Sequence, residues 1–182
     1  ANGQTITGTD SVCTGSFTVL SGSPAGGTWS SAAPVIATVD AAGAVTGLSA
    51  GTTIITYTVS SSSATVTINV LASPSAITGP SHVCAGSTIM LNDTPGGGAW
   101  LSSDPSVSTV SGTGLVTGIT SGIATISYTL FTGCLATYAV TVNSLPAAIS
   151  GPSSVCAGAN VTMTDATPGG AWSSSNTAVA LI

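Results

Sequence analysis

The sequence repeats itself with a period of 71 to 72 residues, and this repeat limits the possible folds more than any other feature. The motif Val-Cys-x-Gly occurs three times, with its cysteine at Cys13, Cys84 and Cys156. Such a period exceeds the roughly 20 to 50 residues of solenoid repeats and fits a small independent β-sandwich. We therefore expect repeat 1 over residues 1–71, repeat 2 over residues 72–143 and a partial repeat 3 over residues 144–182.

Within each repeat, short segments rich in β-branched residues are separated by clusters of Gly, Pro, Ser and Asn, as around residues 53–59 and 65–70. This pattern is typical of strands joined by turns, and no long window has the apolar period of a helix. The expected class is all-β, with tandem β-sandwich domains. The joints at residues 71–76 and 143–148 each contain one Pro and no Gly. Because Pro restricts the chain, we expect stiff joints and a rod.

The charge content is very low. The chain has no Lys or Arg, five acidic residues and a single His. Without fixed positive charge it cannot neutralise phosphates, so nucleic acid and anionic membrane surfaces are excluded as electrostatic partners. No apolar run approaches the roughly 20 residues of a membrane helix, so no membrane span is expected in this segment. A neutral, hydroxyl-rich surface suits a protein that self-associates or carries glycans.

The middle of each repeat carries a specific pattern of Trp, Gly and Val, at residues 29–40 and 43–56 of repeat 1 and residues 100–107 and 114–118 of repeat 2. This pattern resembles the bacterial immunoglobulin-like domain (group 2), as found in long surface proteins of Bacteroidetes-type bacteria. The resemblance implies immunoglobulin-like sandwiches of about seven strands, acting as spacers or adhesive modules in an extracellular or cell-surface protein.

Large aromatic residues recur at matching places and are expected in the core. Each Trp follows a glycine-containing turn, from which it can enter a strand and pack centrally. Gly47 and Gly118 each follow Val-Thr and are expected to be turn residues with a positive φ. The expected core aromatic residues are Trp29, Trp100, Trp172, Tyr57 and Tyr128.

The four cysteines predict one disulfide bond. Cys84 and Cys134 lie near the start and the end of repeat 2, and a bond between them would stabilise the repeat by about 4 kcal/mol in the chain-entropy model. The position in repeat 1 that matches Cys134 is Ser63, so Cys13 has no partner within its own repeat. Cys13 and Cys156 are therefore expected either as free thiols or as partners in an intermolecular disulfide.

No catalytic, metal or cofactor site is expected. His82 is isolated, a nucleophilic Cys–His pair needs an orienting third group, and no two cysteines have zinc-ligand spacing. The five acids are scattered, which leaves open only a single ion at a joint between domains. Glycosylation is predicted at Ser11, in an Asp-Ser-Val motif, and at the sequons of Asn92 and Asn160.

These observations favour a structural repeat module of an extracellular fibre, stalk or adhesin. The incomplete third repeat would expose strand edges that a neighbouring subunit could complete, giving a filament by self-association. The alternative is a carbohydrate- or surface-binding module, which is weaker because the Trp and Tyr residues fall at core-like positions. Ice binding through threonine rows, such as Thr52-Thr53 and Thr65–Thr67, is weaker still because the strands are short and unlike one another. An enzyme is not expected.

Overall fold

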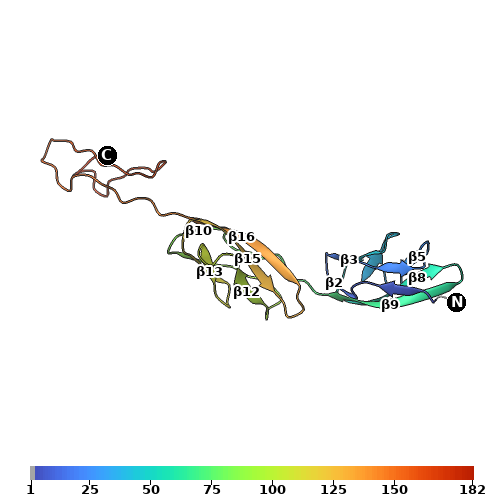
Figure 1. Cartoon of the computed structure of the whole chain (residues 1–182). Helices are drawn as coiled ribbons and strands as arrows, with labels where there is room; N and C mark the ends of the chain where they lie inside the picture. Colours follow the sequence, from blue (N-terminus) through green and yellow to red (C-terminus); the bar gives the residue numbers. More distant parts are fainter. Residues whose placement is uncertain (1–2) are drawn as a thin grey trace.

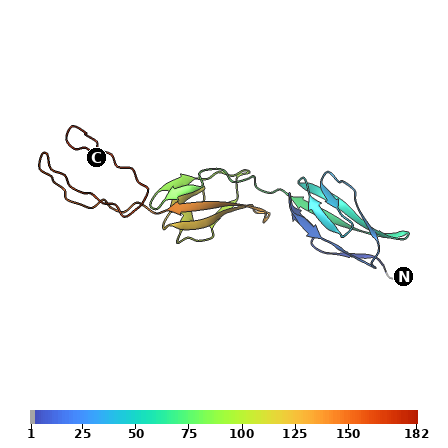
Figure 2. The ribbon, with the colours of Figure 1, turned by 90° about the horizontal axis from the view of Figure 1, so that it is seen from above.

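The computed structural model describes residues 3–182, and this part of the chain contains strands, turns and loops but no helix. Two β-sandwiches follow one another in a row, and residues 144–182 extend beyond the second (Figure 1). The view from above shows the same row, with the chain ends at opposite ends of the molecule (Figure 2). The expected all-β class and the rod of tandem sandwiches are confirmed.

Repeat 1 folds into two sheets and a small ribbon. The larger sheet has the order β2-β9-β8-β5, the smaller has the order β3-β7-β6, and β1 pairs with β4. All these pairs are antiparallel except β2 with β9, which are parallel. The strands are β1 (Thr5–Thr7), β2 (Ser11–Cys13), β3 (Phe17–Val19), β4 (Ser21–Ser23), β5 (Thr28–Ser31), β6 (Ala37–Val39), β7 (Ala44–Gly47), β8 (Gly51–Val59) and β9 (Ser62–Leu71).

Repeat 2 has the same topology, with the sheets β10-β16-β15-β12 and β11-β14-β13. An isolated bridge between Thr78 and Asn92 stands where repeat 1 has its ribbon. Its first and last strands, β10 and β16, are again parallel. The strands are β10 (His82–Cys84), β11 (Thr88–Met90), β12 (Ala99–Ser102), β13 (Ser108–Val110), β14 (Leu115–Gly118), β15 (Gly122–Thr129) and β16 (Leu135–Asn143).

Alternating residues of both sheets form a separate core in each sandwich. In repeat 1 the centre consists of Val45, Ile55 and Ile68, which are fully buried. In repeat 2 the matching residues are Val116, Ile126 and Val140, and they are fully buried too. Burial of each such side chain stabilises the fold by roughly 1.5–3 kcal/mol.

The two halves of a repeat contribute different strands to its sheets. In repeat 1 the strands up to residue 39 occupy only edge positions, whereas the central strands β7, β8 and β9 come from the second half. A first half therefore has no neighbour for most of its backbone donors and acceptors until the second half is in place.

Residues 144–182, which we call the 144–182 segment, correspond to such a first half. The segment contains one isolated bridge, between Ser150 and Thr164, and no strand. Nearly all of its residues are exposed, including Val155 and Met163, whose counterparts in repeat 2 are the buried Val83 and Leu91. Local turns are formed, as between Ala159 N–H and the carbonyl of Cys156 (3.0 Å), but no sandwich is built.

Gly47 and Gly118 are not turn residues with a positive φ, so that expectation was wrong. They end strands β7 and β14, and glycine is required there because the two sheets approach closely. A Cβ atom on Gly47 would lie 2.9 Å from Cγ1 of Val70 and 3.0 Å from the carbonyl oxygen of Cys13. The positive φ of this hairpin belongs to Gly43, at 84°.

Candidate functional site

A disulfide bond joins the two sandwiches across their joint. It links Cys13, at the end of β2, to Cys134, in the turn between β15 and β16, with a Cα–Cα distance of 5.8 Å. Cys134 is buried and Cys13 is half-buried. The bond closes a loop across 121 residues and ties the β15–β16 hairpin of repeat 2 to the end of repeat 1 that faces it.

The expected bond between Cys84 and Cys134 is therefore wrong, and the strand register gives the reason. Cys84 pairs with Asn143, at the end of β16, whereas Cys134 lies just before β16 begins. At roughly 3.3 Å per residue, the two cysteines lie about 30 Å apart at opposite ends of the sandwich. The same register places Cys13 beside Leu71, at the joint that the hairpin reaches. Cys13 is thus neither a free thiol nor a partner of Cys156.

Hydrogen bonds hold the joint between the sandwiches at both of its ends. Towards repeat 1, Ser73 N–H donates to Oγ1 of Thr14 (3.0 Å), and the Ser73 hydroxyl donates to the carbonyl of Thr14 (2.8 Å). Towards repeat 2, Ser75 N–H donates to the carbonyl of Thr94 (2.8 Å), and the hydroxyls of these two residues lie 3.0 Å apart. Pro74 lies between these two anchors.

In each complete repeat a tyrosine ring fills a recess between the tryptophan and the glycine turn that precedes it. We call this recess the tyrosine socket. The hydroxyl of Tyr128 donates to the carbonyl of Pro95 (2.9 Å) and accepts from Gly98 N–H (2.7 Å), and its ring centroid lies 4.7 Å from that of Trp100. A Cβ atom on Gly98 would lie 2.5 Å from Cζ of this ring, so the glycine turn makes room for it. In repeat 1, Tyr57 makes the same contacts with Trp29, Pro24 and Gly27.

Tyr57 and Tyr128 are buried, while Trp29 and Trp100 are half-buried and pack against the two cores. The tryptophans stand on the sheet-edge strands β5 and β12 and do not occupy the core centre.

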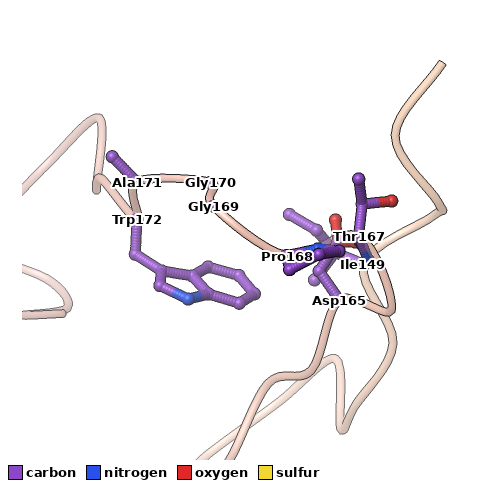
Figure 3. A pocket seen from close by; sticks show the side chains of 8 residues that line it. All are labelled: Ile149, Asp165, Thr167, Pro168, Gly169, Gly170, Ala171 and Trp172. Atoms are coloured by element: carbon purple, nitrogen blue, oxygen red, sulfur yellow. The ribbon is translucent and has the colours of Figure 1, made fainter. Parts of the chain in front are cut away.

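Trp172 is not a core residue, contrary to expectation: 43% of its surface is exposed. Its indole ring lies beside a hollow of about 290 Å³ that is bounded by Pro168 and the Gly169–Gly170 turn (Figure 3). A hollow of about 220 Å³ remains at the same place in repeat 2, where Tyr128 forms one of its walls. The 144–182 segment thus carries the tryptophan and the turn of the socket without the tyrosine strand that completes it.

The other sequence-predicted residues do not come together. His82 is exposed on β10, two residues from the exposed, unbonded thiol of Cys84, and Cys156 is exposed and unbonded too. Ser11 is half-buried on β2, and Asn92 and Asn160 are exposed, so their glycosylation stays a prediction. Among residues 3–182, no group of three or more His, Cys, Asp or Glu side chains could hold a metal ion.

Burial at the joint affects one acid. It raises the pKa of Asp93 above its usual value, and the nearby backbone amides of Thr94 and Ser75 offset part of this rise. Neither carboxylate oxygen has a well-aligned hydrogen-bond partner. Asp104, which is half-buried, has its pKa lowered mainly by the hydroxyl of Ser106, which donates to its carboxylate at 2.6 Å.

The inter-repeat disulfide was missed from the sequence, although a signal for it was present. Repeat 1 has Cys13 at its start but Ser63 where its own hairpin cysteine would stand. If the first cysteine of each repeat bonds to the hairpin of the next repeat, repeat 1 needs no hairpin cysteine of its own, which accounts for Ser63. A bond within each repeat does not.

The bacterial Ig-like domain (group 2) model matches the chain twice, over residues 6–70 and 87–141. A curated relative, "Ice-binding protein 1" of Shewanella frigidimarina (strain NCIMB 400), is 34% identical over 116 residues, which covers 56% of this chain and 13% of the relative. The chain thus spans only a small part of that protein's length.

Solved structures that match the chain include domains 1–6 of the surface layer protein SbsC, with 19% identity and a TM-score of 0.29, covering 80% of this chain and 27% of that one. A C-terminal fragment of intimin, in complex with the intimin-binding domain of its translocated receptor, has 18% identity and a TM-score of 0.39, covering 66% and 53%. No helix in residues 3–182 has the length and apolarity needed to cross a membrane. On the two family-model matches, which cover more than half of its length, the chain belongs to the bacterial Ig-like domain (group 2) family.

Proposed function

We propose that this chain is a structural repeat module of an extracellular fibre, stalk or adhesin. The observation that carries the proposal is the covalent bond between Cys13 and Cys134, which ties one sandwich to the next across their joint. A disulfide of this kind persists in an oxidising environment outside the cytoplasm. A spacer that must keep its length benefits from such a bond, because the bond prevents the sandwiches from separating.

Single-molecule force spectroscopy of the chain, pulled from its two ends, tests this role. With the disulfide intact, the chain between the two cysteines, whose sequence separation is 121, is shielded from the force. Reduction should add roughly 40 nm of extension, at about 3.3–3.6 Å per residue. The variant Cys13→Ser should show the longer extension without reduction, and the matched variant Cys84→Ser should not. An untreated wild-type chain that releases its full length would contradict the proposal.

We further propose that the 144–182 segment accepts strands from the second half of a repeat. The segment corresponds only to strands that occupy sheet edges in a complete repeat. Its residues Val155 and Met163 are exposed. The hollow beside Trp172 lies where a complete repeat has its tyrosine socket. A synthetic peptide with the sequence of residues 111–143 provides strands matching β14, β15 and β16, together with Tyr128.

Binding of this peptide should shift the fluorescence of Trp172 to shorter wavelength, because the indole ring becomes covered. The control peptide carries Ala in place of Tyr128 and should shift the emission less. Association between chains would show as dimers or larger species in sedimentation at high concentration. A peptide that leaves the emission unchanged, together with a chain that stays monomeric, would contradict the acceptor role.

Ice binding has one observation in its favour besides the name of the relative. On the outer face of repeat 1, Thr56 stands opposite Thr65, and Thr52 opposite Asn69. On the matching face of repeat 2, Ser127 stands opposite Thr137, but Ile123 stands opposite Thr141, so the threonine pattern continues only in part along the rod. We therefore expect no thermal hysteresis, and a freezing-point assay at millimolar concentration decides between the two functions.

A carbohydrate- or surface-binding module remains the other alternative. Exposed aromatic side chains are the feature it requires, and Phe131, at the tip of the β15–β16 hairpin, is 96% exposed. This side chain stands beside the joint without a second exposed ring nearby in the hairpin, which favours the structural role.

A further inference from the structure

Cys84 occupies in repeat 2 the position that Cys13 occupies in repeat 1. Cys13 lies opposite the last residue of β9, and Cys84 lies opposite Asn143, the last residue of β16. The following residue bonds in the same way in both repeats: Thr14 N–H donates to the carbonyl of Leu71, and Ala85 N–H to the carbonyl of Asn143, each at 2.9 Å. The two cysteines thus stand at the same end of their sandwiches.

The close packing around the two cysteines is also the same. A Cβ atom on Gly47 would lie 3.0 Å from the carbonyl oxygen of Cys13, and one on Gly118 would lie 2.8 Å from that of Cys84. Cys84 is unbonded and exposed at the joint that leads into the 144–182 segment. Since Cys13 at this position is bonded to a hairpin cysteine of the next repeat, the molecule itself shows which partner the position takes.

From this equivalence we infer that Cys84 is the site of a second inter-repeat disulfide, formed with a cysteine in the last hairpin of a complete repeat that follows repeat 2. Each repeat would then be bonded through its first cysteine to the hairpin of its successor. The inference goes beyond the structural role proposed above and depends on it only for the oxidising surroundings.

The bond forms by thiol–disulfide exchange with a small disulfide such as oxidised glutathione. The Cys84 thiolate attacks this disulfide, which gives a mixed disulfide and releases one small thiolate. The hairpin thiolate then attacks the sulfur of Cys84 and releases the second small thiolate. Two protein thiols are oxidised, one small disulfide is reduced to two thiols, and two protons leave the protein thiols and are taken up by the released thiolates.

The test uses the full chain extended after Ile182 by a copy of residues 111–143, which completes the third repeat and adds a copy of Cys134. The protein is refolded in reduced and oxidised glutathione, its free thiols are blocked, and it is digested before Asp residues. The expected map joins the fragment 40–92, which contains Cys84, to the fragment that begins at Asp165. The original chain has two alkylatable thiols, Cys84 and Cys156, and the extended chain should have one.

The control carries Ser in the appended copy of Cys134 and should leave Cys84 open to alkylation. A second chain, in which a complete copy of residues 72–143 replaces the 144–182 segment, covers the case that the completed third repeat does not fold. Bonding of Cys84 to the last hairpin cysteine in either chain supports the inference. If Cys84 stays alkylatable in both chains while Cys13 remains bonded to Cys134, the inference is wrong.

Discussion

The two joints of the chain have similar sequences but different structures. Each has one proline, Pro74 in the first and Pro146 in the second. The first joint is held by the Cys13–Cys134 bond and by the hydrogen bonds between Ser73 and Thr14. The second joint has Leu145 and Ala85 at the places of Ser73 and Thr14, which cannot form these side-chain bonds.

The difference shows which contacts connect the two sandwiches at the first joint. A proline limits the conformations of the linker, but it does not fix one sandwich relative to the next. At the first joint the disulfide bond between Cys13 and Cys134 connects the two sandwiches directly, and Ser73 of the linker is hydrogen-bonded to Thr14. The 144–182 segment contains no counterpart of the β15–β16 hairpin, and the bond that Ala147 N–H donates to the hydroxyl of Thr167 (2.8 Å) lies within the segment.

The largest loss of stability is expected when the first joint is made to resemble the second. The variant Cys13→Ser removes the bond across 121 residues and should lower the free energy of unfolding of the two sandwiches by about 4–5 kcal/mol in the chain-entropy model. Denaturant titration under non-reducing conditions measures this change. Cys84→Ser is the matched control and should change the value by less than about 0.5 kcal/mol. Equal stability of Cys13→Ser and wild type would show that the bond does not stabilise the joint.

A smaller loss of stability is expected when a hydrogen bond of the first joint is removed. Thr14→Val removes the hydroxyl that accepts from Ser73 N–H and should cost about 1 kcal/mol. The amide of Ser73 should then exchange its hydrogen faster, while the amides of β8 and β9 keep their protection. Ala85→Val alters the matching position of the second joint and serves as the control. Unchanged exchange at Ser73 in Thr14→Val would mean that this hydrogen bond does not order the joint.

The smallest effect is electrostatic and has a predictable sign. Because burial raises the pKa of Asp93 in the folded chain, the folded state binds the proton more tightly than the unfolded state, whose reference pKa is 3.8. Stability from this group is therefore present below pH 3.8 and is lost as the pH rises through the folded-state pKa. Asp93→Asn should be more stable than wild type at pH 7, and this advantage should vanish below pH 3.8.

Asp104→Asn provides the opposite case. The pKa of Asp104 is lowered by its bonds from Ser106, so its contribution is present above pH 3.8 and is lost as the pH falls through the folded-state pKa. The variant should therefore be less stable than wild type at neutral pH. Thermal unfolding of both variants between pH 2.5 and pH 7 shows whether each substitution raises or lowers the stability of the chain at each pH. A gain from Asp93→Asn that persists at pH 2.5 would rule out titration as its cause.

The sequence was sufficient to predict features that depend on local patterns. β-branched segments and turn residues identify the strands, and the glycine turns precede the strands that carry Trp29 and Trp100. The local turns at Cys156 and Asn176 form even in the incomplete repeat. These features need only a few neighbouring residues, so they follow from the chain itself.

The errors concern contacts between residues that are distant along the chain. The Cys84–Cys134 bond assumed that the start and the last hairpin of one repeat are close, whereas parallel pairing of β10 with β16 separates them by the length of a strand. Trp172 was expected in a core, yet the strands that would cover it lie in the second half of a repeat. The glycine at position 47 was assigned to a turn because the close approach of Val70 is not visible in a single strand.

The most direct test of the central claim is a disulfide map of the unreduced 182-residue chain. Cleavage before Asp residues, followed by chymotrypsin cleavage after Tyr138, separates Cys13, Cys84, Cys134 and Cys156 into four fragments. A rod whose sandwiches are tied together across their joint predicts a bond between the fragments of Cys13 and Cys134, with Cys84 and Cys156 alkylated. A bond between the fragments of Cys84 and Cys134 would confine the disulfide to one repeat and contradict the account.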